Sequence, residues 1–350
     1  MVGTGSASAA AGPTLAMVAR EAGVSVPTAS KVVNGRKDVA PETRRRVTEA
    51  LNRLGYVRRS RFEAAGPPRL VDLVLESLDG PGSGPVLRGV AEAAHEAGLE
   101  VVVSAVPDGT ASGRAEHAWL DRAAARGSCG VLFHLPGLSP SQHSWLTRRR
   151  LPYVLIDPAH QPPPGVVSVG AADGQGAVTA TEHLLALGHE RIAVLAGRPG
   201  TVHGDARVAG YRSALAAAGV QQHAEYVRHA GPDGTGARLC TLELLDLPEP
   251  PTAVFACSDR MALGIHEALA ERGLRAPDDL SVVGFGDLPE ARWAVPALTT
   301  VHRPLAEMAT TALRLLVRLA RGERLAGTRT ELPTRLVPRT STATRPGPGR

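Results

Sequence analysis

Residues 14–35 read TLAMVAREAGVSVPTASKVVNG, and this stretch predicts two short helices joined by a tight turn. Thr14 is a candidate N-cap for the first helix, which ends before Gly23. Ser25 is a candidate N-cap for the second helix, which ends before Asn34. Two short helices across a glycine turn have the spacing of a helix-turn-helix.

A third helix is predicted from Pro41 to Gly55. Proline suits the first turn of a helix, and glycine commonly ends one. Apolar residues recur every three to four positions between them, which is typical of an amphipathic helix packed on its neighbours. Residues 14–57 therefore form a predicted three-helix unit, and residues 1–13 are expected to be disordered.

The positive charge of the chain is concentrated at this end. Residues 1–66 carry eleven lysines and arginines against five aspartates and glutamates, whereas the other 284 residues carry 28 against 29. The net charge of +5 therefore comes entirely from the first segment. A small basic segment on a near-neutral body indicates a nucleic-acid-binding module, although arginine is also abundant throughout the chain.

From residue 70 onward, apolar β-branched segments alternate with alanine-rich amphipathic segments. The predicted strands are residues 70–75, 100–105, 130–133, 153–156, 166–169, 192–196, 253–256 and 281–285. The predicted helices are residues 85–97, 116–126, 175–187, 206–218, 235–246, 261–271 and 305–321. This alternation predicts an α/β fold with two parallel sheets, each covered by helices on both faces. A ligand would then bind between the sheets, beyond the carboxyl ends of the strands.

Several other classes of protein are disfavoured. No run of eighteen uncharged apolar residues exists, and the first dozen residues do not resemble a signal peptide, so no membrane association and a cytoplasmic location are expected. The three cysteines, at positions 129, 240 and 257, form no CxxC pair and are expected to be reduced. His183 and His189 are six residues apart and no HExxH motif exists, so no metal site is expected.

The rival function is a nucleotide- or small-molecule-binding enzyme with an incidental basic N-terminus. The run GPGSG at residues 80–84 lies between a predicted strand and a predicted helix. It lacks both the GxGxxG register and the Gly-Lys-Ser/Thr of a P-loop, so the enzyme hypothesis is the weaker one and no cofactor is expected. A cytoplasmic binding protein that has lost DNA binding is a third alternative.

The helix-turn-helix stretch resembles the DNA-binding headpiece of the LacI/GalR family of bacterial repressors. The resemblance continues in EHLLALGHERIAV (182–194), ACSDRMALG (256–264), LSVVGF (280–285) and PALTTV (296–301). It covers roughly residues 14–339 in one order, which a single short motif does not do. It implies a homodimeric repressor that binds an inverted-repeat DNA operator and responds to a small molecule, usually a sugar.

The resemblance also implies a periplasmic-binding-protein-like body whose chain crosses three times between two doubly wound subdomains. We expect residues 58–68 to be the hinge and residues 69–339 to be the effector-binding and dimerisation domain. The N-subdomain would contain about residues 69–168 and 300–326, and the C-subdomain about 170–298 and 328–339. Residues 340–350 are Thr, Ser, Pro and Gly without periodicity, and are expected to be disordered.

The same resemblance places candidate DNA contacts on the second helix. Val26, Pro27 and Lys31 match base-reading positions, where lysine suits guanine O6 and N7 and the apolar pair suits a thymine methyl. The matching phosphate-contact positions, all with hydroxyl or amide groups, are Ser25, Thr28, Ser30 and Asn34. An N-cap role is at least as well supported for Ser25.

The hinge departs from the family pattern. Family members insert a hinge leucine into the minor groove, nine residues after the tyrosine that matches Tyr56, and this chain has Ala65 there. Alanine is too small a wedge to open a base step. The candidate contacts to phosphates or to a narrow groove are Arg58, Arg59 and Arg61. Phe62 is a substitute wedge or, more simply, packs against the body.

Candidate effector contacts also follow from the resemblance. Arg207 matches an effector-binding arginine and opens a predicted helix, although an ion pair with Asp173 or Asp205 would explain it as well. The other candidates, which follow predicted strands, are Asp157, Asp173, Ser258 and Asp287. Charged and hydroxyl groups of these types bind sugar hydroxyls.

One effector position differs from the family pattern. The family has an effector-binding aspartate directly after Val-Gly-Phe, where this chain has Gly286, and Asp287 follows one residue late. The small residues at 80–84 also replace bulkier ones. Both changes open the predicted cleft, so a larger or differently shaped effector is expected.

Overall fold

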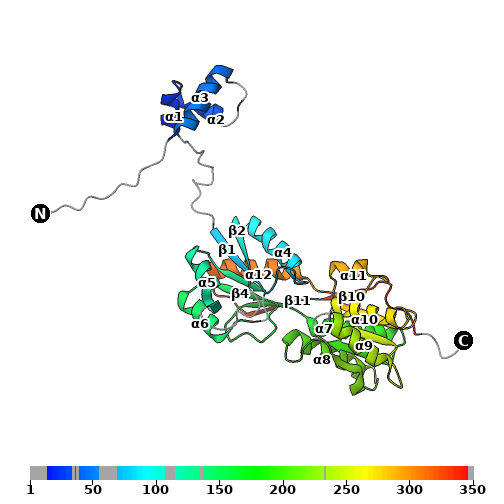
Figure 1. The fold of residues 1–350 in the computed structure, drawn as a ribbon. Coiled ribbons are helices and arrows are strands. Elements are labelled where there is room, and N and C mark those ends of the chain that lie inside the picture. The colour runs from blue at the N-terminus through cyan, green and yellow to red at the C-terminus, as the bar shows by residue number, and fades with distance from the viewer. Residues whose placement is uncertain are drawn as a thin grey trace. The chain divides into compact units, whose positions relative to one another are not determined.

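The structure, a computed structural model, describes residues 14–33, 36, 39–54, 69–106, 115–134, 137–231 and 234–345. The chain divides into two compact units, residues 1–68 and 69–350 (Figure 1). The predicted disorder of residues 1–13, the hinge at residues 58–68 and the final five residues lie outside the described residues.

The first unit is the predicted three-helix headpiece. Its helices are α1 (Leu15–Glu21), α2 (Val26–Val33) and α3 (Pro41–Leu54). Each helix contributes a fully buried side chain to one core, namely Val18, Ala29 and Val47. Gly23 lies in the turn between α1 and α2 with φ of 62°, a conformation that glycine adopts without steric cost. The tight turn and the shared core hold α2 in place, so that the side of α2 facing away from the core is exposed to solvent.

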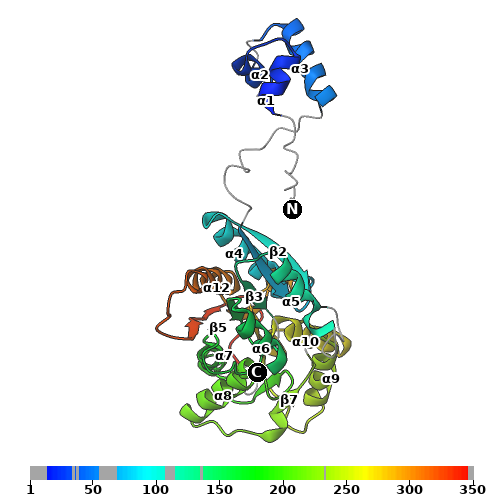
Figure 2. The same ribbon diagram turned by 90° about the vertical axis from the view of Figure 1, so that its left-hand side faces the viewer.

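The second unit begins with a sheet whose described strands run in the order β2-β1-β3-β4-β5-β11, all parallel. They are β1 (Arg69–Leu75), β2 (Leu99–Ala105), β3 (Val131–His134), β4 (Tyr153–Ile156), β5 (Ser168–Ala171) and β11 (Arg329–Leu332). Helices α4 (Ser83–Glu96) and α12 (Leu305–Ala320) pack on one face, and α5 (Ala115–Ala125) and α6 (Pro140–Arg149) pack on the other (Figure 2). This sheet and its helices form the N-subdomain.

The C-subdomain contains a second sheet, whose described strands have the order β7-β6-β8-β9-β10-β12. They are β6 (Ile192–Ala196), β7 (Val227–His229), β8 (Ala253–Ala256), β9 (Ser281–Gly286), β10 (Thr299–His302) and β12 (Arg335–Val337), with β12 antiparallel to β10. Its helices are α7 (Asp173–Ala186), α8 (Val202–Ala217), α9 (Gly234–Leu245), α10 (Asp259–Glu271) and α11 (Pro289–Trp293), with a short 3-10 helix at Ala224–Tyr226. Two sheets with helices on both faces confirm the predicted α/β architecture.

Close glycine packing sets the positions of α7 and α8. A Cβ atom on Gly210 of α8 would lie 2.3 Å from the Gly174 carbonyl oxygen of α7, so no other residue fits there without movement. This approach brings residues 206–210 of α8 next to the start of α7, where the chain enters the C-subdomain.

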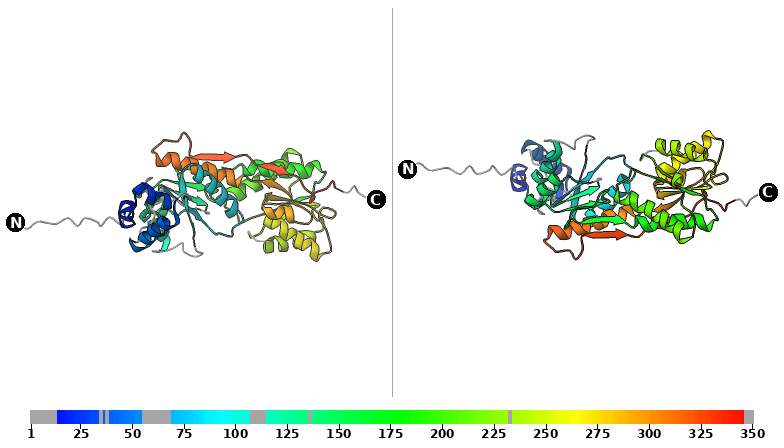
Figure 3. Two further views of the ribbon diagram at one scale, coloured as in Figure 1. Left: turned by 90° about the horizontal axis from the view of Figure 1, so that it is seen from above. Right: turned by 90° about the horizontal axis from the view of Figure 1, so that it is seen from below.

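The chain crosses between the subdomains after β5, after β10 and after β11 (Figure 3). Each crossing lies later in the chain than the sequence boundaries predicted. Strand β5 completes the first sheet, because Ser168 pairs with Leu155 of β4. Strand β10 belongs to the second sheet and β11 to the first. The approximate boundaries at 168, 300 and 328 therefore lie a few residues before the crossings, because each strand finishes its hydrogen-bond ladder before the chain leaves the sheet.

The predicted disorder of residues 340–350 is wrong for residues 340–345. Ser341 is fully buried, its Oγ accepts a hydrogen bond from the Thr299 amide at 2.8 Å, and it donates to the Val282 carbonyl at 2.6 Å. The Val282 amide in turn donates to the Ser341 carbonyl at 2.8 Å. Short polar side chains here are ordered by hydrogen bonds to strand backbone, which a search for apolar periodicity does not detect.

Candidate DNA-binding surface and effector cleft

Helix α2 has one buried side and one exposed side. Ala29 and Val32 are buried against the headpiece core. Val26 is 45% exposed, and Pro27 and Lys31 are also exposed. The three residues predicted to read bases therefore share the solvent side of a short helix that is held at both ends by packing. An exposed apolar residue beside a lysine suits base edges in a major groove.

Ser25 has the capping role that the sequence analysis weighed for it. Its Oγ accepts a hydrogen bond from the Thr28 amide at 3.4 Å and lies 2.8 Å from Thr28 Oγ1. Ser30 is half-buried on the same helix. The remaining predicted DNA contacts and hinge residues lie outside the described residues, and they are Asn34, Arg58, Arg59, Phe62, Arg61 and Ala65.

A cavity of about 370 Å³, which we call the central cleft, lies between the two subdomains. It opens at the carboxyl ends of strands from both sheets, as predicted for two doubly wound subdomains. Its lining residues at or after the ends of N-subdomain strands include Ser77, His134 and Asp157. Those of the C-subdomain include His203, Arg207, Ser258 and Phe285.

Arg303, which the sequence analysis missed, lies at the centre of a buried ion network beside this cleft. It follows β10 at the second crossing, and its guanidinium binds the Asp157 carboxylate at 2.6 and 2.9 Å. It also binds the Asp173 carboxylate at 3.0 and 3.2 Å. Arg207 completes the network with bonds to Asp173 Oδ1 at 2.9 and 3.2 Å. A carboxylate after β4 and a carboxylate at the first crossing are thus joined to two guanidinium groups.

Asp157 and Arg303 keep their charges although they are buried. Burial raises the pKa of the Asp157 carboxyl, but the charge and hydrogen bonds of Arg303 outweigh it and hold that pKa well below its usual range. Burial lowers the pKa of Arg303, but Asp157 and Asp173 outweigh it and raise that pKa above its usual value. Two positive and two negative side chains leave this wall of the cleft with no net charge.

Arg207 lines the cleft, and it also makes an ion pair, which the sequence analysis gave as the alternative explanation for this residue. The partner is Asp173 rather than Asp205. Arg207 also donates to the Cys257 carbonyl at 2.8 Å, and its guanidinium carbon lies 4.2 Å from the centre of the Phe285 ring. Helix α8 begins at residue 202, so Arg207 lies in its second turn, and the prediction that Arg207 opens the helix is wrong.

Comparisons with known proteins agree with this geometry. The sequence model described as "Bacterial regulatory proteins, lacI family" matches residues 14–59, and that of a "Periplasmic binding protein-like domain" matches residues 181–342. The transcriptional regulator CelR of Thermobifida fusca is 34% identical over 338 residues, covering 94% of this chain and 98% of CelR. The lactose operon repressor of Escherichia coli is 30% identical over 334 residues, covering 94% and 90%.

The chain belongs to the lacI family. It is a DNA-binding transcriptional regulator and not an enzyme. Solved structures of family members have the same fold. A CelR–cellobiose complex has a TM-score of 0.70 at 34% identity, covering 94% of this chain and 99% of that one. A lac repressor dimer bound to operator and the anti-inducer ONPF has a TM-score of 0.71 at 29% identity, covering 95% and 100%.

Two neighbouring residues at the start of α10 have separate roles in this family member. Ser258 lines the cleft and caps α10, because its Oγ accepts a hydrogen bond from the Met261 amide at 3.2 Å. Asp259 does not cap that helix. It is fully buried and accepts from Thr300 Oγ1 at 2.5 Å and from the Leu288 amide at 2.7 Å. Burial raises its pKa to about 6.

Asp287 does not line the central cleft, contrary to the sequence prediction. Its carboxylate binds Arg339 and lies 3.0 Å from His302 Nδ1, and its side chain is only 3% exposed. Gly286 has φ of 139° and Asp287 has φ of 55°, so the backbone turns here and directs the carboxylate to β10 and the C-terminal segment. Because this aspartate stands one residue later than in the family pattern, its carboxylate binds Arg339 and His302 and does not face the cleft.

Two absences concern the described residues alone. No helix in those parts of the chain is long and apolar enough to cross a membrane. Over the same residues, no group of three or more His, Cys, Asp or Glu side chains is placed to hold a metal ion.

Proposed function

We propose that two copies of the chain bind an inverted-repeat operator, with one α2 helix in the major groove at each half-site. An eight-residue helix reads only a few base pairs, whereas specific protein–DNA interfaces bury about 1,000–2,500 Å². Two headpieces acting together supply that area. The structural similarity to a lac repressor dimer on its operator supports the same arrangement.

Base recognition falls to Val26, Pro27 and Lys31, because they share the exposed side of α2. Phosphate contacts, which position the headpiece without reading sequence, fall to Ser25, Thr28, Ser30, Asn34, Arg58, Arg59 and Arg61. The basic excess of the first 66 residues strengthens both kinds of binding at low salt. A regulator of bacterial operators acts where the DNA is, so its location is the cytoplasm.

The central cleft binds the effector, and the arrangement of its walls is the observation that carries this proposal. Asp157 belongs to the N-subdomain, Arg207 and Ser258 belong to the C-subdomain, and Arg303 lies on the chain that connects them. A ligand that contacts all four binds one arrangement of the subdomains more tightly than another. Differential binding of this kind shifts the population of arrangements and so couples the cleft to operator affinity.

The effector is an uncharged, hydroxyl-rich molecule of the sugar class. Asp157 and Arg303 are paired with each other, and Asp173 is shared between Arg303 and Arg207, so an ionic ligand would have to break a buried pair. Hydroxyl groups can share these charged donors and acceptors without displacing them. CelR, which has a solved complex with cellobiose, and the lactose operon repressor support this class and a repressor role.

The test measures operator binding and effector response together. Operator fragments are selected from genomic DNA, and binding is followed by fluorescence anisotropy at several salt concentrations while neutral mono- and disaccharides are titrated. We expect sequence-selective binding and a change in operator affinity with at least one neutral sugar. Salt-sensitive binding without sequence preference would overturn the regulator–operator part. Selective binding that responds only to charged metabolites would overturn the sugar part.

A further inference from the structure

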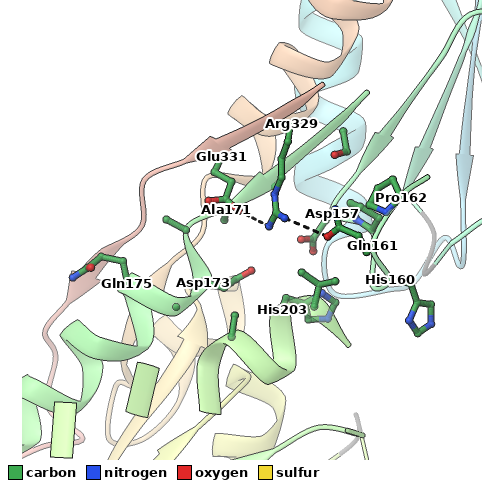
Figure 4. A pocket seen from close by; sticks show the side chains of 17 residues that line it. Asp157, His160, Gln161, Pro162, Ala171, Asp173, Gln175, His203, Arg329 and Glu331 are labelled. Carbon is green, nitrogen blue, oxygen red and sulfur yellow. Dashed lines mark hydrogen bonds and ion pairs between the residues drawn. The ribbon is translucent and has the colours of Figure 1, made fainter. Parts of the chain in front are cut away.

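A second cavity of about 320 Å³ lies beside the central cleft (Figure 4). Strands β5 and β11 form its floor, the loop after β4 forms one wall, and the first turns of α7 and α8 form the other. We call it the lateral cavity, and the side chains that matter here are those of Gln161, Ser168, His203, Arg329 and Glu331, together with Gly170.

The floor of the lateral cavity is a gap in the helical cover of the first sheet. Ser168 pairs with Leu155 of β4, whose side chain belongs to the core under α5 and α6. Residues 168 and 170 of β5 therefore lie on the same sheet face as that core. A Cβ atom on Gly170 would meet no atom within 4 Å. On the neighbouring strand, Arg329 is in register with Ser168 and Glu331 with Gly170.

A contact between the subdomains separates the lateral cavity from the central cleft. The Val202 amide at the start of α8 donates to the Ala159 carbonyl at 2.7 Å. Ala159 lines the central cleft, whereas its neighbours Pro158 and His160 line the lateral cavity. Asp157 and His203 contribute to both linings. The lateral cavity is therefore a compartment of its own that shares two side chains with the effector site.

The polar groups of the lateral cavity are mixed donors and acceptors. Arg329 binds Glu331 at 2.5 Å and Gln161 Oε1 at 3.4 Å, so the positive charge is already paired. Burial lowers the pKa of His203, which keeps its imidazole neutral near pH 7. His203 Nδ1 is buried and has no hydrogen-bond partner among the described residues. A neutral imidazole, an amide and a hydroxyl around a floor of small residues suit the hydroxyl groups of a polyol.

Two other ligand classes fit less well. Among the described residues, the side chains that line the lateral cavity include no Phe, Tyr or Trp ring, so they offer no stacking surface to a flat aromatic ligand such as a nucleobase. A carboxylate ligand would be repelled by the Asp157 and Asp173 carboxylates. An amine ligand would have to displace Arg303 from these carboxylates, or Arg329 from Glu331. Ligand cavities begin at about 300 Å³, so a molecule the size of one sugar ring fits the volume.

We propose that the lateral cavity is a second binding site for a neutral polyhydroxylated molecule the size of one sugar ring, separate from the effector in the central cleft. Gln161, Ser168 and His203 contact its hydroxyl groups, and the open face above Gly170 holds its ring.

The decisive variant fills the cavity from its floor. Gly170→Phe places an aromatic ring in the open space, and aromatic residues suit a strand. Gly327→Phe is the matched control, because a Cβ atom there also meets nothing within 4 Å and residue 327 does not line the cavity. Gln161→Leu removes an amide from an exposed position and keeps the cavity volume. Circular dichroism and operator binding establish that each variant is folded.

Titration calorimetry of the full chain uses glucose and sorbitol as neutral probes and glucuronate and glucosamine as charged ones. We expect a neutral probe to bind wild type and Gly327→Phe equally, with at least a tenfold loss for Gly170→Phe and a smaller loss for Gln161→Leu. A probe that binds both cavities of the wild type should still bind the central cleft of Gly170→Phe. Its stoichiometry per chain should then be half that of the wild type.

Three outcomes overturn the proposal. They are no binding of either neutral probe, tighter binding of a charged probe, and identical affinity and stoichiometry for Gly170→Phe and Gly327→Phe. If Gly170→Phe and Gly327→Phe bind identically but a sugar still changes operator affinity, the second site is refuted and the proposed regulator function stands. If Gly170→Phe loses a calorimetric binding site but no sugar changes the operator affinity of the wild type, the second binding site stands and the proposed sugar effector does not.

Discussion

Replacing Arg303 with methionine removes the centre of the buried ion network while keeping much of the side-chain volume. The Asp157 carboxylate then loses both its hydrogen bonds from a guanidinium, at 2.6 and 2.9 Å, and Asp173 keeps only Arg207. The Asp157 and Asp173 side chains are 14% and 5% exposed, so solvent does not replace the lost partner. Removing one member of a buried pair costs about 3–5 kcal/mol. We expect Arg303→Met to lower the free energy of unfolding by about that amount at pH 7.

The loss depends on pH in a defined direction. In the wild type Arg303 holds the pKa of Asp157 below its value in the unfolded chain, so the pair stabilises the fold above the unfolded pKa and the contribution is lost as the pH falls through the folded pKa. In the variant burial is the largest remaining effect on Asp157 and raises its pKa above the unfolded value, whereas His203 and His134 oppose it less strongly. Protonation then relieves the destabilisation, so the difference between wild type and variant narrows from about pH 7 to about pH 4.

Urea unfolding followed by circular dichroism measures both effects. Arg318→Met is the control, because its ion pair with Glu323 is 49% and 41% exposed and contributes at most about 1 kcal/mol. Adding Asp157→Asn to Arg303→Met removes the unpaired carboxylate and should recover part of the loss. A loss for Arg303→Met that equals that of Arg318→Met, or that is the same at pH 5 and pH 7, would refute the reasoning.

Three further predictions concern the headpiece and the C-subdomain. Lys31→Ala should weaken operator binding by about 1–3 kcal/mol and flatten selectivity at one base pair per half-site, and an equal loss on random DNA in anisotropy assays would remove its base-reading role. Asp259 has a pKa raised to about 6, above its value in the unfolded chain. The stability of the wild type relative to Asp259→Asn should therefore rise as the pH falls from about 8 to about 5. Urea midpoints of the two proteins that differ by a constant amount across this range would contradict this prediction. Ser341→Val leaves the Thr299 amide unsatisfied and should cost about 1–3 kcal/mol in urea unfolding, whereas Thr340→Val at an exposed position should cost less than about 0.5 kcal/mol; equal losses would show that the C-terminal segment does not contribute through Ser341.

The headpiece and the alternating strands of the body could be predicted because their signals are local. Gly23, the caps at Thr14 and Ser25 and the apolar spacing of each helix are visible within a few residues. Helix α6 had a local signal that the sequence analysis did not use. Ser139 and Gln142 form a capping box around Pro140, which is a recognisable start of a helix.

The central cleft was predicted in position but not in composition. Asp157, Asp173, Arg207 and Ser258 lie at or behind its walls, as the resemblance implied. Arg303 has no local signal, because its partners Asp157 and Asp173 precede it by 146 and 130 residues. The direction of Asp287 was missed because the positive φ angles of residues 286 and 287 turn its side chain away from the cleft.

Sheet membership could not be assigned from sequence for the strands next to the crossings. Strands β5, β10 and β11 are each four residues long, and either sheet would accept their composition. Which sheet accepts them depends on hydrogen-bond partners far away in the chain. The sequence prediction therefore found two subdomains and misplaced the three points at which the chain passes between them.

The order of the strands has a consequence for how the regulator is made. Strands β11 and β12 are translated after every other strand of their sheets, yet β11 pairs with β5 and β12 with β10. The headpiece needs only residues near the start of the chain and folds as a unit while synthesis continues. During synthesis there is accordingly a period in which the headpiece is complete on a ribosome-bound chain. In that period each of the two sheets that enclose the effector cleft still lacks one edge strand. Control by a small molecule begins only when that period ends.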